Sequence, residues 1–413
     1  MKTIFILPCC VWILSLVGLA AWYAVDQPTG WDYGVITKAA REVGAGMNPY
    51  RVEAAEQDAF LQSAAARAGA PRPFIYVYPP VTLLALKVFA DLPLVLRNGC
   101  YWLLYGLMIL LQIRVALLLA EPRERIFLCS VAPLVLFFPG GLLFDSVLGG
   151  NIAFILYGLI FGALWIGWKR DRWGWFYAAV LLASCVKMPY LEYLAIPLLC
   201  RRGRWLQVSA VAAGGVALFA AQGLLRPALF HDYMDAVNRI FVYNNDFGSG
   251  PSGRFGAVAG ALGRHYALWG TVFYLALSAA LFGFLLSLSR FYKRGVLRDE
   301  QWFPVMLLGV ALLFPRLIEY DLFPFTIAMA LLAFRGVRAT RHPRTWTSVL
   351  LTAWIGANLW ACGWAGDGRL AWKNIACVLL LSVFAGGCVP LLRVIRAGRV
   401  VEEKALAGAH IFA

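Results

Sequence analysis

The sequence predicts an all-α protein that crosses a membrane many times. Hydrophobic residues make up 61% of the 413 residues, charged residues only 14%, and the mean hydropathy is +0.71. Soluble domains are about 45–50% apolar and about 25% charged. The long unbroken apolar runs suit helices, which satisfy their own backbone hydrogen bonds in lipid, and not the alternating strands of a barrel. We therefore predict one membrane-embedded domain over residues 1–413 with about 11–13 transmembrane helices.

The net charge of +15 does not indicate a nucleic-acid-binding protein. Such a protein would carry its cations on one phosphate-binding face, whereas here they cluster between apolar runs, as in cytoplasmic loops. The nine cysteines lie mostly within apolar runs and show no metal-ligand spacing, so we expect buried thiols and neither a metal nor a cofactor. The basic clusters lie at 169–172, 201–204, 293–298, 335–344 and 393–399.

The N-terminal part contains one apolar run and then the longest polar stretch. The run at about 4–25 is too long for the core of a signal peptide, which predicts an uncleaved anchor with a cytoplasmic N-terminus. Residues 26–73 would form the first external loop. Two helix-like pieces, about 33–45 and 52–69, are separated by the turn signal Asn48-Pro49 and predict amphipathic helices on the membrane surface.

The chain enters the bilayer again after Tyr76. The apolar runs between 81 and 143 do not alternate cleanly between the two sides, so we expect one of them to form a hairpin or to lie partly in the interface. The basic turn at Arg123 and Arg125 is the ambiguous point. Apolar runs follow at about 81–96, 101–119, 126–143, 151–168, 173–187, 189–199, 206–225, 268–288, 303–314, 317–334, 347–362 and 375–392.

Residues 226–266 predict a second external loop. Its run of glycine, serine and proline at 248–253 is typical of a mobile segment. The loop is therefore either a lid over a substrate or a plain connector.

Asp32 is the first candidate for chemistry. It follows the first apolar run and lies between aromatic residues near a membrane surface. A carboxylate there could accept a proton from an attacking hydroxyl group as a general base. It could equally be the N-cap of the following helix. The residues alone leave both interpretations open.

Charged residues within apolar runs are the second group of candidates. Lys187 interrupts such a run, where a charge costs about 2.5–3.5 kcal/mol on membrane-insertion scales. It either extends its ammonium group to the interface or binds an anion such as phosphate. The segment 315–322 places Arg316, Glu319 and Asp321 between two apolar runs. These three charges either pair with one another or hold a phosphate and a sugar hydroxyl.

The order of these motifs resembles glycosyltransferase family 87, the polyprenyl-phosphate-mannose-dependent α-mannosyltransferases with the GT-C fold. The resemblance extends over about residues 1–334. In two places the chain departs from the family pattern: the usual Gly-Gln before a span reads Gly149-Gly150-Asn151, and the late motif lacks the histidines that often follow a tryptophan. The matching segments are Asp32-Tyr33, Gly46-Met47-Asn48-Pro49-Tyr50, Tyr78-Pro79-Pro80, Lys187-Met188-Pro189 and Pro315 to Leu322.

The resemblance implies a GT-C-like bundle and an activity. The enzyme would transfer a hexose, mannose by the family norm, from a polyprenyl-phosphate sugar to an envelope glycolipid or polysaccharide, with inversion. Asp32 would be the general base, and neither a nucleotide sugar nor a metal would be needed. The residues implied to bind the donor phosphate or the substrate are Lys187, Arg316, Tyr33, Asn48, Tyr50, Tyr78, Glu319, Tyr320, Asp321 and Arg264.

The resemblance also implies a location and partners. The protein would span the cell (inner) membrane among its lipids, with the active site facing the periplasm or the cell exterior and without a nucleic-acid partner. A multi-pass transporter or lipid flippase is the alternative function. It predicts inverted internal repeats, and the sequence shows no such symmetry.

Overall fold

The structure is a computed structural model that describes residues 30–64, 73–122, 124–125, 128, 142–200, 205–244, 248, 250–262, 266–359 and 368–409. Every regular element within these ranges is a helix. The predicted span at 4–25 lies outside the described residues, as do Arg123 and Arg264.

Five helices of the described part are long and apolar enough to cross a membrane. This confirms the prediction of an all-α polytopic membrane protein, whereas the total of about 11–13 spans stays a prediction. The five are α6 (Leu94–Leu118), α12 (Trp205–Leu225) and most of α15 (Tyr266–Lys293), α17 (Glu319–Arg338) and α19 (Gly368–Ala409).

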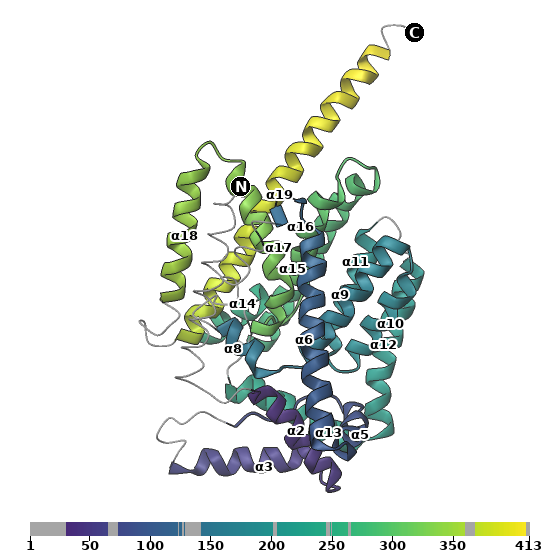
Figure 1. Ribbon diagram of the computed structural model, residues 1–413, viewed down its shortest axis with the longest axis vertical. Coiled ribbons are helices and arrows are strands. Elements are labelled where there is room, and N and C mark those ends of the chain that lie inside the picture. Colours follow the sequence, from purple (N-terminus) through teal and green to yellow (C-terminus); the bar gives the residue numbers. More distant parts are fainter. Residues whose placement is uncertain are drawn as a thin grey trace.

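The other helices are shorter, and they include the two predicted in the first external loop. Figure 1 shows α2, α3, α5 and α13 gathered at one end of the bundle, while the C-terminal part of α19 projects at the other end. These helices are α2 (Trp31–Gly44), α3 (Pro49–Gln62), α5 (Thr82–Asp91), α8 (Leu142–Gly149), α9 (Ala153–Arg170), α10 (Trp173–Ser184), the 3₁₀ helix η1 (Met188–Leu194), α11 (Ala195–Leu199), α13 (Pro227–Asn244), α14 (Pro251–Ala261), α16 (Asp299–Ala311) and α18 (Pro343–Leu359).

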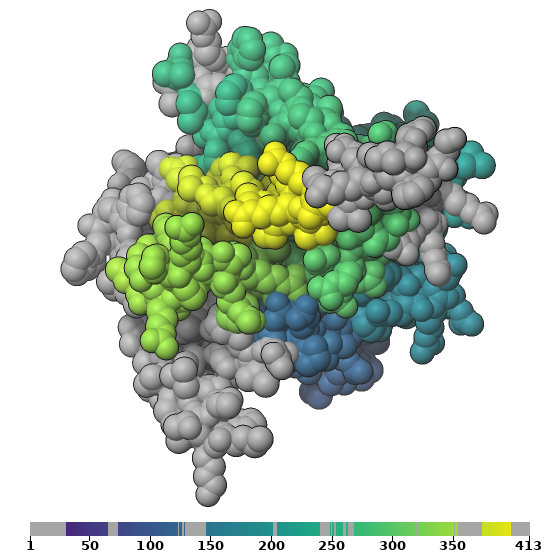
Figure 2. All heavy atoms as spheres, turned by 90° about the horizontal axis from the view of Figure 1, so that it is seen from above, coloured from purple at the N-terminus to yellow at the C-terminus, as the bar shows by residue number. Residues whose placement is uncertain are grey.

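The two ends of the bundle differ in charge. Lys293, at the end of α15, donates a hydrogen bond to the carbonyl oxygen of Leu198 in α11 (2.8 Å). Arg335, near the end of α17, pairs with Glu124, which follows α6 (2.7 Å). Basic clusters from distant parts of the sequence thus meet at one end, which we call the basic end. Figure 2 views this end and shows the end of α6 (blue) and α19 (yellow) on the same face. The opposite end, with α2 and α3, is the loop end.

The short helix α5 explains why the predicted crossings after residue 81 do not alternate cleanly. It has ten residues, a length of about 15 Å, which is half of the roughly 30 Å of a hydrocarbon core. Its Ala90 packs against Gly44 of α2 at the loop end. Pro93 separates it from α6, which reaches the basic end. Of the described helices in this region, α5 is therefore too short to cross, and Arg125 lies at the basic end.

The two segments predicted to be external loops are fastened to each other. Asp232 of α13 accepts hydrogen bonds from Asn48 and from Arg51 of α3, both at 2.8 Å. Arg239 of α13 makes a two-bond contact with Asp58 of α3, at 2.7 and 3.1 Å. The first half of the segment 226–266 is therefore a helix, α13, that rests on α3.

Helices α6 and α9 approach each other closely at glycines. A Cβ atom on Gly158 would lie 2.5 Å from the Cβ of Met108 and 2.8 Å from its carbonyl oxygen. One on Gly162 would lie 2.7 Å from a methyl group of Leu111. Small residues allow such close packing in membranes, where helix association depends on van der Waals contact.

We predict that Gly158→Ala destabilises the protein although alanine favours helices. The methyl group would collide with backbone atoms, and overpacking costs about 1–3 kcal/mol. Thermal unfolding in detergent should show a lower melting temperature. Gly106→Ala in α6 is the matched control, because a Cβ there meets nothing within 4 Å. Equal melting temperatures for the two variants would contradict the prediction.

Glu53 makes the stability of the first loop sensitive to pH. Its side chain, 1% exposed, accepts a hydrogen bond from the backbone N–H of Tyr76. Burial raises the pKa of Glu53 from 4.5 to about 7. Between these values the folded state keeps a proton that the unfolded state has lost, so the free energy of unfolding falls as the pH rises.

We predict that the free energy of unfolding falls by on the order of 3 kcal/mol between pH 4.5 and 7. Melting temperatures measured from pH 5 to pH 8 test it. Glu53→Gln should flatten the profile, because glutamine accepts the same hydrogen bond and carries no charge. Glu56→Gln, at an exposed position of the same helix, should retain most of the fall with pH, because burial is the main cause of the raised pKa of Glu53 and the charge of Glu56 a minor one. An unaltered profile for Glu53→Gln would refute the assignment.

Candidate functional site

Asp32 lies in the first turn of α2, half-buried, where this helix meets the turn between α8 and α9. Its carboxylate accepts a hydrogen bond from the amide group of Asn151. Asn151 is 2% exposed, and its own oxygen accepts a hydrogen bond from the N–H of Ala153 (2.8 Å). That second bond orients the amide, because the oxygen faces α9 and the NH₂ group must then face Asp32.

The N-cap interpretation of Asp32 is wrong. The N-cap of α2 is Gly30, in the left-handed conformation with φ 79°, and it makes no side-chain capping bond. Gly30 instead donates a backbone hydrogen bond to the carbonyl oxygen of Leu148 in α8 (2.9 Å). Asp32 is the second residue of the helix, so its carboxylate is directed to Asn151.

The turn that carries Asn151 requires a glycine at position 150. Gly150 has φ 71°, and a Cβ there would lie 2.6 Å from the ring of Trp102. Its carbonyl oxygen accepts a hydrogen bond from the hydroxyl group of Tyr101 (2.6 Å). Only glycine fits both the left-handed backbone and this close approach. The turn therefore fixes the position of Asn151 and, through it, that of Asp32.

Tyrosines surround Asp32. The hydroxyl group of Tyr33 donates to Asn98 (2.6 Å), and its ring centroid lies 4.4 Å from that of Tyr101. Tyr78 is buried close enough to Asp32 for the two to interact electrostatically. Burial and the nearby negative charge raise the pKa of Tyr78. Its hydroxyl group is therefore a neutral hydrogen-bonding group beside the carboxylate.

Lys187 lies between α10 and η1, half-buried, in the same region as Asp32. Its ammonium nitrogen is 4.1 Å from the ring centroid of Tyr320, a cation–π contact. Three charged side chains are within electrostatic reach of it: Asp321, Asp32 and Arg316. The structure thus brings Lys187 and these three charged residues together, although Asp32 is separated from Asp321 by most of the chain.

Asp321 is a structural partner in this cluster. It is 4% exposed, and one carboxylate oxygen accepts from the hydroxyl group of Tyr157 (2.9 Å). The other accepts from the N–H of Ile318 (3.2 Å), which caps the start of α17. Because both oxygens are engaged, the geometry supports a role in anchoring α17 and balancing the charge of Lys187. A direct contact with a sugar hydroxyl stays a prediction.

Asn48 and Tyr50 contact protein groups. Asn48 caps α3 by accepting from the N–H of Tyr50 (3.1 Å), while its amide donates to Asp232. Tyr50, 2% exposed, donates its hydroxyl hydrogen to the carbonyl oxygen of Tyr78 (2.5 Å). These residues hold the segment that carries Tyr78. A substrate contact for them stays a prediction, and Arg264 and the side chain of Glu319 lie outside the described residues.

Sequence reasoning missed the role of Asn151. The signal was an amide residue directly before an apolar run, at a point where the family pattern has glutamine.

Among the residues that the structure describes, no group of three or more His, Cys, Asp or Glu side chains could hold a metal ion. The groups available here are two carboxylates, Asp32 and Asp321, two cations and neutral tyrosines.

Comparison with known proteins gives one match. The sequence pattern of glycosyltransferase family 87 matches residues 76–318, which is more than half of the 413 residues. The match includes Tyr78, Asn151 and Lys187, while Asp32 precedes it. No curated protein and no solved structure matches the chain. With this match and five apolar helices of membrane-spanning length, the chain belongs to glycosyltransferase family 87 and is a multi-pass membrane glycosyltransferase.

Proposed function

We propose that the protein transfers a hexose, with mannose as the first candidate, from a polyprenyl-phosphate sugar to a hydroxyl group of an envelope glycolipid or polysaccharide. Asp32 is the general base. The observation that carries the proposal is a half-buried carboxylate, oriented by Asn151, within electrostatic reach of Lys187. A base and a cation in one place serve the two ends of a displacement reaction.

The reaction is a single displacement. The acceptor oxygen attacks the anomeric carbon on the face opposite the phosphate, and the bond between that carbon and the phosphate oxygen breaks, which inverts the configuration. Asp32 takes the proton of the attacking hydroxyl group. The electron pair of the broken bond stays on the lipid phosphate, where Lys187 and Arg316 stabilise the added negative charge.

The surroundings of Lys187 suit a phosphate-binding role. The ring of Tyr320 lies against its ammonium group, and Asp321 balances its charge from a buried position. Both contacts hold the lysine in place before a phosphate arrives, so less ordering is needed on binding. A polyprenyl chain can remain in the bilayer while its phosphate meets this cation.

The distribution of basic residues along the bundle suggests which side of the membrane the site faces. The candidate site lies where α9 and α17 begin, and both helices end in basic residues, such as Arg170 and Arg335. Positively charged ends lie on the cytoplasmic side. The site would then face the periplasm or cell exterior, in the cell (inner) membrane, and take its donor from the outer leaflet.

We predict that Asp32→Asn lowers sugar transfer at least about a hundredfold, since a general base contributes about 10²–10⁴-fold. Membranes that contain the protein would be supplied with polyprenyl-phosphate mannose, and the glycosylated product would be measured. Asp91→Asn, an exposed carboxylate at the same end of the bundle, is the control and should keep full activity. Full activity of Asp32→Asn in well-expressed protein would remove the base assignment.

We predict that Asn151→Leu lowers kcat about tenfold to a hundredfold and leaves KM for the donor nearly unchanged. The carboxylate would lose its orientation, and a small misplacement of a reacting group can cost about a hundredfold. Gln112→Leu is the matched control, because Gln112 is a buried amide of α6 that donates to the Phe154 carbonyl oxygen of α9 (2.7 Å). Equal losses in the two variants would reduce the role of Asn151 to packing.

A further inference from the structure

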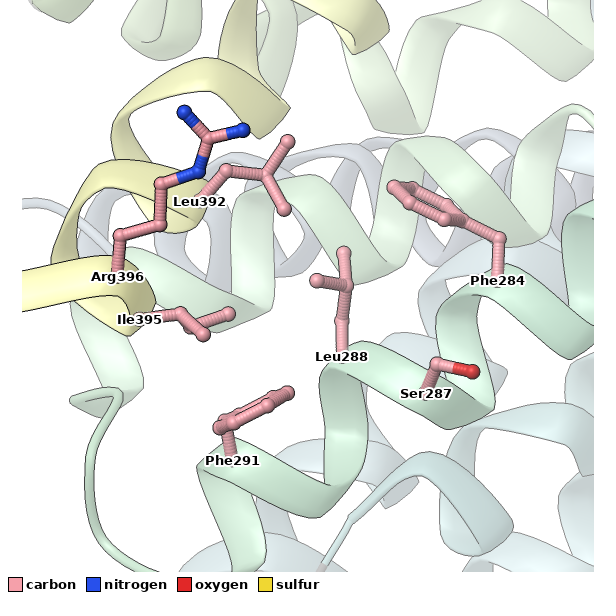
Figure 3. Close-up of a pocket in the computed structure, with 7 residues that line it drawn as sticks. All are labelled: Phe284, Ser287, Leu288, Phe291, Leu392, Ile395 and Arg396. Carbon is pink, nitrogen blue, oxygen red and sulfur yellow. The ribbon is translucent and has the colours of Figure 1, made fainter. Parts of the chain in front are cut away.

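A groove lies between α15 and α19, near the basic end and away from the candidate site. Four residues of α15, between Phe284 and Phe291, line one side, and Leu392, Ile395 and Arg396 of α19 line the other. Figure 3 shows Phe284 at one end of the groove and Arg396 at the other. Figure 2 shows α19 beside α15 when the molecule is viewed from the basic end.

The groove exists because both helices pack on a third. At Gly309 of α16, side chains from both sides crowd the backbone, namely Leu285 of α15 and Phe384 of α19. The rings of Phe284 and Phe384 lie edge to face at 6.3 Å, at the inner end of the groove. From there towards Arg396 the two helices leave an elongated apolar depression.

The position of the groove places it in contact with membrane lipid. Both walls belong to helices of membrane-spanning length, 268–293 and 374–397, and the lining residues occupy the last turns of each. The wall is apolar, and the hydroxyl group of Ser287 is already satisfied by the carbonyl oxygen of Gly283 (2.9 Å). An acyl chain is therefore the complementary occupant of this part.

Arg396 gives the groove a charged end. It lies exposed one turn after Leu392, and in the part of the chain that the structure describes no acidic side chain pairs with it. Its level, at the end of a spanning segment, is that of the lipid headgroups. Basic pockets between transmembrane helices on the cytoplasmic side recognise anionic lipid headgroups, and the guanidinium group matches a phosphate in charge and geometry.

We propose that the groove between α15 and α19 binds an anionic membrane phospholipid, with an acyl chain along Phe284, Leu288 and Phe291 and the phosphate at Arg396. The site is separate from the candidate transfer site at the loop end. It does not depend on the function proposed above.

The test compares two lipids that differ only in headgroup charge. Full-length protein, delipidated in detergent, is titrated with dioleoyl phosphatidylglycerol or dioleoyl phosphatidylcholine, and bound lipid is counted by native mass spectrometry. We expect the anionic lipid to bind about tenfold more tightly. Arg396→Gln should remove the preference, whereas Arg393→Gln, an equal loss of charge on the same helix outside the groove, should retain it.

A second variant tests the groove independently of charge. Ser287→Trp fills the depression with an indole ring and should lower binding of the anionic lipid although Arg396 remains. Unchanged binding in Ser287→Trp would overturn the placement of the acyl chain. Equal binding of the two lipids to the unaltered protein would overturn the charge recognition, and so would equal losses in Arg396→Gln and Arg393→Gln. Both groove variants should keep their sugar-transfer activity, which shows that they are folded.

Discussion

The hydrogen bond from Asn151 to Asp32 ties the candidate base to the membrane bundle, and the orientation of the carboxylate depends on it. A helix as short as α2 is marginal on its own, so its position must come from tertiary contacts. The contacts converge on one turn: Gly30 donates to the Leu148 carbonyl, and Gly150 takes the left-handed conformation beside Trp102. The candidate base is thus held by the turn before α9, although it belongs to a segment predicted to be an external loop.

The charged side chains around Lys187 suit a reaction that moves negative charge from one group to another and leaves the total charge of the site unchanged. Two cations, Lys187 and Arg316, face two carboxylates, Asp32 and Asp321. In the proposed reaction the lipid phosphate gains one negative charge while Asp32 becomes neutral on accepting a proton. The total charge of the site then stays constant from substrate to product. This constancy is valuable near a membrane, where an unbalanced charge costs several kcal/mol.

The fold class and the loop helices could be predicted from the sequence because their signals are local. Apolar runs mark spans, and Asn48-Pro49 marks the break between α2 and α3. Hydropathy could not show that the run 81–96 stops at Pro93 and lies along α2, because an apolar surface can meet protein as well as lipid. Nor could it show that Asn151 contacts Asp32, 119 residues earlier. Such contacts depend on how helices pack, and one sequence does not specify a pairing between distant polar residues.

A glycine in the segment predicted to be the second external loop has two explanations. Gly248 suggests mobility in the sequence, yet in the structure it is buried with φ 71°, and a Cβ there would lie 2.5 Å from the Leu317 carbonyl oxygen and 3.0 Å from the Arg316 side chain. Glycine is needed at this position for close packing. Arg316 is a candidate phosphate ligand, so a phosphate that draws its side chain would alter the surface on which the loop rests. The ion pairs between α13 and α3 are partly exposed and would resist movement by only about 0–1 kcal/mol each. If Arg316 binds the phosphate as proposed, it would also connect the occupied site with the position of Gly248.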